Sequence, residues 1–170
     1  MEPTHLERAL AAAPERPVAS LSAAGEEYFL FRLGPLTLGV RSALVREVTR
    51  RGPLTPLPRA PPFLRGVIGH RGEVFPLVDL LRFLGQGEGR STAQGRVFVG
   101  VVGASLVGFT VDQVVGLRRL AAPEVLPAPA SGPRSRELVL GVAALPDLGT
   151  VTLLALERVV ESARHQVQAR

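Results

Sequence analysis

The chain contains no cysteine, lysine, asparagine or tryptophan. Without cysteine, disulfide bonds, thiolate nucleophiles and cysteine-based zinc or iron–sulfur centres are all excluded. Without lysine, a phosphate-binding loop of the Gly-x-x-x-x-Gly-Lys type is excluded as well. No apolar run approaches the roughly 20 residues of a membrane-spanning helix, and the first 24 residues lack the long apolar stretch of a secretory signal. We therefore expect a cytoplasmic protein that holds neither a metal nor a cofactor.

The charged residues are unevenly distributed along the 170 residues. All 20 basic residues are arginine, and the formal net charge is +5. Residues 1–40 carry a net charge of −2, residues 41–96 carry +6 and residues 97–170 carry +1. A basic region of this size can steer an acidic partner or bind phosphates. Because aromatic residues make up only 5% of the chain, the stacking expected of a nucleic-acid-binding surface is mostly missing.

Residues that could perform catalysis are few and unconnected. The three histidines, at positions 5, 70 and 165, have no nucleophile placed to pair with them, and no serine lies in a nucleophile elbow. Asp79 and Asp112 each follow an apolar stretch and could form an acid–base pair. Both also stand where a helix or turn begins, which favours a capping role. We do not expect an enzyme.

Short apolar segments separated by glycine and proline predict a chain made mainly of β-strands. Strands are indicated over residues 28–33, 36–40, 96–102, 105–111, 114–120, 138–145 and 150–154. Residues 42–48 fit either a helical turn or a bent strand, and the prolines in residues 54–62 restrict that segment to a loop or a sheet edge. About ten short strands with little helix favour small all-β barrels.

The ends of the chain and its middle are expected to be less regular. Residues 1–25 have too little apolar surface to offset their ordering entropy and are expected to form a flexible leader. The folded domain is expected over residues 26–163, with a junction between two halves near residues 85–95. Apolar residues at helical spacing predict a closing helix over residues 155–163, which leaves residues 164–170 as a tail.

One hairpin stands out, because it places an arginine at a tight corner. Val67 and Ile68 lead into the Arg71-Gly72 pair, and a second apolar strand leads away from it. Glycine permits the positive φ that such a turn needs. The planar guanidinium of Arg71 could then bind a carboxylate within the protein or on a partner, or could simply be solvated. Glu47, isolated in a basic neighbourhood, is the carboxylate that could pair with it, or it could simply be solvated beside Arg46.

From about residue 26 to residue 162 the chain resembles the CheW family, the scaffolds that couple bacterial chemoreceptors to the CheA histidine kinase. The segments that carry the resemblance are residues 29–33, 45–48, 57–67, 71–80, 107–114 and 140–143. The resemblance implies an all-β fold in which two five-stranded SH3-like barrels share a core, with a short C-terminal helix. It also implies a non-enzymatic adaptor that reaches the membrane only through receptors and binds no nucleic acid.

The resemblance further implies roles for particular residues. It places Glu47, Arg65, Arg71, Gly108, Val114 and Leu117 in receptor binding, with the last three on the second barrel. It places Val45 and Val48 of the first barrel where a kinase regulatory domain would dock, and it makes Gly66 and Gly72 structural turn residues. Gly108 and Val114 could instead serve packing alone.

Some alternatives stay open at this stage. Gly69 and His70 occupy positions where the family usually has asparagine and an apolar residue, and His70 could change receptor choice or reflect the general loss of asparagine. An adaptor of an accessory array controlling motility or gene expression fits the same sequence. A basic nucleic-acid-binding β-barrel is a further alternative.

Overall fold

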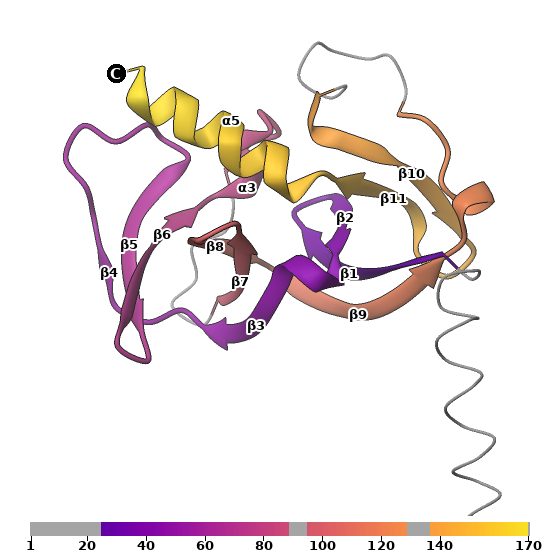
Figure 1. The fold of residues 1–170 in the computed structure, drawn as a ribbon, viewed down its shortest axis with the longest axis horizontal. Coiled ribbons are helices and arrows are strands. Elements are labelled where there is room, and N and C mark those ends of the chain that lie inside the picture. The colour runs from indigo at the N-terminus through magenta and orange to yellow at the C-terminus, as the bar shows by residue number, and fades with distance from the viewer. Residues whose placement is uncertain (1–24, 89–94, 129–136, 170) are drawn as a thin grey trace, which may run out of the picture.

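A computed structural model describes residues 25–88, 95–128 and 137–169. The expected leader over residues 1–25 therefore lies almost wholly outside the described residues. Within the described part, strands dominate and are arranged in two sheets, with a C-terminal helix along one side of the molecule (Figure 1). The prediction of a mainly β fold is confirmed.

The first sheet has five strands in the order β10-β11-β2-β1-β9. Their bounds are β1 Glu26–Leu33, β2 Leu36–Arg41, β9 Gln113–Leu120, β10 Val139–Leu145 and β11 Gly149–Leu154. All neighbouring pairs are antiparallel except β11 and β2, which are parallel. Four consecutive residues of β1, Tyr28 to Phe31, are buried, so this strand packs against a core on both of its faces.

The second sheet has six strands in the order β3-β7-β8-β6-β5-β4. Their bounds are β3 Val45–Arg50, β4 Leu54–Thr55, β5 Leu64–His70, β6 Glu73–Val78, β7 Arg96–Val102 and β8 Ser105–Val111. The two-residue β4 is the extra strand relative to the expected five, and it forms the start of residues 54–62, the segment predicted to be a loop or a sheet edge. Residues 42–48 contain both of the structures considered for them, a helical turn and a strand, because a 3-10 turn, η1 Ser42–Leu44, leads directly into β3.

The sheets do not follow the expected division of the chain near residues 85–95. The strands β3 and β7 pair with each other from opposite sides of that segment, and β1 and β2 join the three last strands. The sheets therefore interleave in sequence, and Gly108, expected on the second barrel, lies in the same sheet as Val45. Local patterns identify strands, whereas pairing between distant strands depends on which apolar faces meet in the folded core.

Three clusters of buried side chains form the core. One cluster lies inside each sheet, and the largest draws on both sheets and the helix. Phe98 of β7 packs against Phe29 and Phe31 of β1, with ring centroids 5.4 Å and 5.0 Å apart. Contacts of this kind join the two sheets, so the expected shared core is present.

The closing helix is longer than expected. It is α5, Leu156–Gln168, and its buried residues are Leu156, Val159, Val160 and Ala163. The expectation of a tail over residues 164–170 is wrong for residues 164–168, because that stretch contains no glycine or proline to end the helix. In the part of the chain that the structure describes, no helix is long and apolar enough to cross a membrane.

Candidate partner-binding surface

The hairpin between β5 and β6 presents Arg71 at a two-residue turn. Arg71 has φ +51° and Gly72 has φ +78°, and His70 pairs with Glu73 across the base of the turn. Two consecutive positive φ values match the twist of the flanking strands and are typical of a type I′ turn. An arginine in the left-handed region is strained, because its Cβ crowds the following carbonyl. The expected hairpin with Arg71 at its corner is confirmed.

A β-bulge in β3 decides which residues of that strand face the core. Val45 pairs with Gly100 of β7, whereas Glu47 pairs with the preceding residue, so Arg46 is the extra residue. Residues three apart on a regular strand point to opposite faces, but one bulge residue brings them to the same face. Val45 and Val48 accordingly both pack against the shared core and are half-buried.

The carboxylate of Glu47 contacts three other polar side chains of this surface. Its Oε1 lies 2.6 Å from Nε2 of His70, and its Oε2 lies 3.8 Å from Nη1 of Arg71. The Nε of Arg46 lies 3.6 Å from the same Oε2. The expected pair between Glu47 and Arg71 is present and partly exposed, since the Arg71 side chain is 76% exposed. These contacts tie the tip of the β5–β6 hairpin to β3.

A second ion pair extends the cluster along the hairpin. Arg46 donates from Nη2 to Oε2 of Glu73 at 2.6 Å. This hydrogen bond raises the pKa of Arg46 and lowers the pKa of Glu73 relative to their ordinary values. Both groups are therefore charged at neutral pH, and we name the set Glu47, Arg46, His70, Arg71 and Glu73 the charged cluster. Glu73 was not expected at this surface, although hairpin register alone places it opposite His70.

Arg65 and Gly66 lie further along β5. Arg65 is half-buried and forms no ion pair with a described residue. Gly66 was expected in a turn, but it stands inside β5 at a bulge with φ +143°. A Cβ there would lie 2.2 Å from the carbonyl oxygen of Thr55. Glycine is thus required at position 66 by the close approach of β4, and only Gly72 belongs to a turn.

The other expected receptor-binding residues differ in exposure. A Cβ on Gly108 would lie 3.0 Å from Val97 and 3.1 Å from Phe75, so this glycine makes room for packing inside the second sheet. Val114 is half-buried against the shared core, and Leu117 of the same strand, β9, is 62% exposed. Figure 1 shows β3 and β9 together on the side of the molecule opposite α5.

One exposed apolar residue on this side was missed. Val74 of β6 follows the Arg71-Gly72 turn closely and is 71% exposed. A single exposed apolar side chain is common on protein surfaces, and Val74 adds apolar area beside the charged cluster. The alternation of β6 was the available signal, because it places Val74 on the face opposite the buried Phe75.

The two aspartates considered for acid–base chemistry act in the fold. Asp79 is buried and caps α3, Leu80–Phe83, by accepting from the Arg82 backbone N–H at 3.2 Å. Asp112 accepts from the Gly34 backbone N–H at 2.6 Å and holds the β1–β2 turn. Among the residues that the structure describes, no group of histidine, aspartate and glutamate could hold a metal ion.

Comparisons with known proteins agree with this architecture. A family model described as the CheW-like domain matches residues 27–164. Protein FrzA of Myxococcus xanthus is 46% identical over 159 residues, covering 93% of this chain and 99% of the relative. The probable chemotaxis protein CheW of Rhizobium etli is 32% identical over 141 residues, covering 82% of this chain and 90% of the relative.

A solved structure resembles the fold. The crystal structure of the scaffolding protein TtCheW from Thermoanaerobacter tengcongensis matches with a TM-score of 0.71 at 23% identity, covering 81% of this chain and 93% of that chain. At this identity the likeness concerns the fold, and it confirms the expected pair of SH3-like barrels.

Proposed function

The chain belongs to the family of CheW-like domains, and on that premise we propose that it couples the helical hairpin tip of a chemoreceptor to the regulatory domain of a CheA-type histidine kinase. It acts as a scaffold in chemotaxis-type signalling and transmits signals by holding surfaces together. The observation that carries the proposal is the charged cluster, two of whose members, Arg46 and Glu47, lie on β3 with the half-buried Val45 and Val48. Such a surface combines apolar area with charges that orient a partner.

The receptor is proposed to bind at the charged cluster. Arg71 is the most exposed cation of that cluster. Its guanidinium keeps donors available, because its one ion pair with a described residue, to Glu47, is 3.8 Å long. Glu47 and His70 hold the hairpin tip in place, and Arg65 adds positive charge along β5. Val114 and the exposed Leu117 extend the surface onto β9, whereas Gly108 supports it through packing.

The kinase regulatory domain is proposed to dock along β3. In the described part of the chain, β3 is an outer strand of its sheet, with β7 on one side and no strand on the other. An open edge offers backbone N–H and C=O groups to another chain. Val45 and Val48 reach the surface beside that edge, so their exposed atoms supply apolar contact. The two proposed surfaces therefore adjoin along β3.

Two variants test whether these surfaces are distinct. Glu47→Gln should weaken binding of the receptor hairpin and spare the kinase domain, because it removes the negative charge that orients His70 and Arg71. Val45→Ala should weaken binding of the kinase domain and spare the receptor. Glu157→Gln, which changes a carboxylate on α5, is the matched control. Calorimetry with both partners is the measurement, and equal losses for both partners in either variant, with the fold intact, would contradict the proposal.

The relatives also bear on which signalling array the adaptor serves. Identity to FrzA, at 46%, is higher than the 32% identity to the relative named probable chemotaxis protein CheW. Because the more similar of these two relatives is not named as a chemotaxis protein, we propose an accessory chemosensory array, controlling motility or gene expression, as the setting of the adaptor. Binding assays against the regulatory domain of each CheA-type kinase in the source organism would identify the array, and preference for the kinase of the principal chemotaxis system would contradict this assignment.

A further inference from the structure

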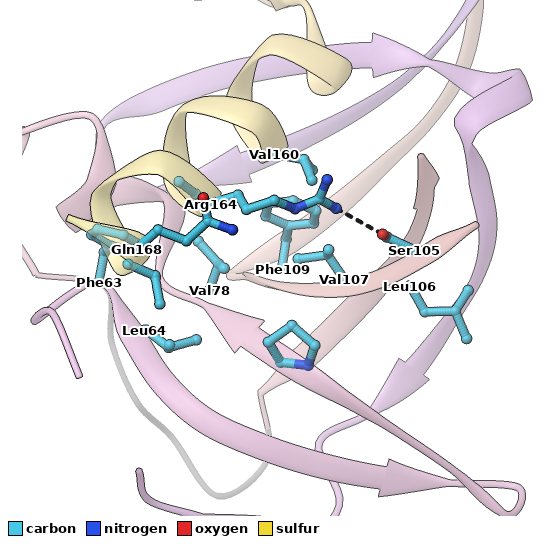
Figure 2. A pocket seen from close by; sticks show the side chains of 13 residues that line it. Phe63, Leu64, Val78, Ser105, Leu106, Val107, Phe109, Val160, Arg164 and Gln168 are labelled. Carbon is cyan, nitrogen blue, oxygen red and sulfur yellow. Dashed lines mark hydrogen bonds between the residues drawn. The ribbon is translucent and has the colours of Figure 1, made fainter. Parts of the chain in front are cut away.

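A pocket of about 460 Å³ lies beneath α5 (Figure 2). This helix is on the side of the molecule opposite β3 and β9 (Figure 1). Its walls come from α5 after its first turn, from β6 and β8, and from Phe63 and Leu64 at the start of β5. None of the residues of the charged cluster lines it. Its volume falls within the range of pockets that hold small organic molecules, about 300–1,000 Å³.

Two neighbouring strands stop pairing beside the pocket. The parallel strands β6 and β8 pair at Leu77 with Gly108 and at Val78 with Phe109. The residue before Leu77 is Pro76, which has no backbone N–H to extend a ladder of hydrogen bonds. Pro76 and Leu106 line the opened space, and the small side chain of Ala163 on α5 leaves it unfilled from above.

The pocket has apolar walls and a polar, positively charged mouth. The walls are apolar and include the buried Phe63, Val107 and Phe109. At the mouth, Arg164 of α5 lies across the pocket and donates from Nη2 to Oγ of Ser105 at 2.7 Å, as the dashed line in Figure 2 shows. A hydroxyl group therefore holds the guanidinium at the entrance to an apolar space.

The guanidinium of Arg164 has no carboxylate partner in the described part of the chain. The nearby carboxylate of Glu161 on α5 faces His165 instead, at 3.9 Å. A guanidinium that lacks an internal carboxylate keeps its fork of N–H donors available for an external one. The charge at the mouth thus complements an anion whose remaining atoms are apolar.

We propose that this pocket binds a medium-chain fatty acid. The hydrocarbon chain occupies the space between α5 and the strands β6 and β8, and the carboxylate accepts hydrogen bonds from Arg164 and Ser105. Burial of the chain supplies most of the affinity, because it removes apolar surface from water on both ligand and protein. The carboxylate sets the orientation of the ligand. This inference is independent of receptor and kinase binding.

Calorimetry of the full-length protein with octanoate tests the proposal, with 1-octanol and acetate as partial probes. We expect one saturable site for octanoate with sub-millimolar affinity, binding of octanol at least fivefold weaker, and no binding of acetate. Arg164→Gln should weaken octanoate at least fivefold and leave octanol unchanged. Arg158→Gln, on the same helix but outside the pocket, is the matched control and should change neither.

Two further variants locate the site. Ala163→Leu should fill the pocket and abolish binding of octanoate and octanol, with a melting curve as the check on folding. Val167→Trp places the larger side chain at a position that lines the pocket yet is 39% exposed, so it carries less risk to the fold and should weaken both probes. Absence of saturable octanoate binding, equal affinity for octanol and octanoate, or unchanged octanoate binding in folded Arg164→Gln or Ala163→Leu would overturn the proposal. Binding of apolar peptides alone would overturn it too.

Discussion

Replacing Arg71 by glycine should separate the role of this residue in the fold from its role in binding. Arg71 occupies the left-handed region with φ +51°, which costs an L-residue roughly 1–2 kcal/mol. Glycine relieves that strain but loses about 0.5–1 kcal/mol through its greater freedom in the unfolded chain. The exposed ion pair to Glu47, at 3.8 Å, contributes only about 0–1 kcal/mol. These terms nearly cancel, so Arg71→Gly should change the free energy of unfolding by no more than about 1 kcal/mol.

Arg71→Ala is the matched variant. It removes the same guanidinium but keeps a Cβ in the left-handed region, so it should be less stable than Arg71→Gly by roughly 1 kcal/mol. Denaturant unfolding followed by circular dichroism measures both values, because the chain has no tryptophan to report by fluorescence. The two variants should therefore differ in stability, although both lose the positive charge of Arg71.

Binding of the receptor hairpin should not follow that order of stability. A hydrogen bond to a charged group contributes about 1.5–3 kcal/mol, so both variants should lose roughly 10- to 100-fold in receptor affinity. Calorimetry with a receptor hairpin fragment is the assay. Receptor affinity equal to wild type in Arg71→Gly, or a loss of stability above about 2 kcal/mol in that variant, would refute the reasoning.

Three other predictions concern the fold. Gly66→Ala should destabilise the protein by at least about 2–3 kcal/mol, because φ is +143° and the new Cβ meets a backbone carbonyl at 2.2 Å. Gly72 has open space around it, so Gly72→Ala should lose only about 1 kcal/mol in denaturant unfolding. Equal losses of stability in the two variants would contradict the steric argument. The hydrogen bonds from Arg118 lower the pKa of Asp147 from 3.8 to about 2, so Asp147 stabilises the fold fully above pH 3.8 and loses that effect as the pH falls toward 2. The deficit in stability of Asp147→Asn relative to wild type should be present in full at pH 6 and much smaller at pH 2, and a constant difference across that range would count against the pair. Removal of residues 1–24 should leave cooperative thermal unfolding unchanged, and a large fall in melting temperature would show that they are part of the fold.

Local sequence patterns predicted the strands well, because those signals act over a few residues. The bounds of β7 and β8 agree with the expected residues 96–102 and 105–111, and the Arg71-Gly72 turn followed from a glycine placed between two apolar runs. The predicted end of α5, at residue 163, was too early, because the helical spacing of apolar residues stops before the helix itself ends. A helix ends where capping residues or breakers stop it, and residues 164–168 contain neither glycine nor proline.

The arrangement of the site depended on information that local patterns do not carry. The bulge at Arg46 turns both Val45 and Val48 toward the shared core, and a regular strand would have placed them on opposite faces. The short contact of His70 with Glu47 needs β3 to meet the tip of the β5–β6 hairpin, which only the closure of the sheet provides. Pairing between sequence-distant strands is a property of the whole core.

A titration of the kinase regulatory domain, receptor hairpin and adaptor together tests the central claim most directly. The adaptor saturated with the kinase domain is titrated with receptor hairpin, and the same titration is performed without the kinase domain. If the charged cluster binds the receptor while the open edge of β3 binds the kinase, receptor affinity should agree within about twofold in both titrations and a 1:1:1 complex should elute in size-exclusion chromatography. Displacement of the kinase domain by the receptor, with affinity falling as kinase concentration rises, would show a single shared surface and contradict the proposed scaffold.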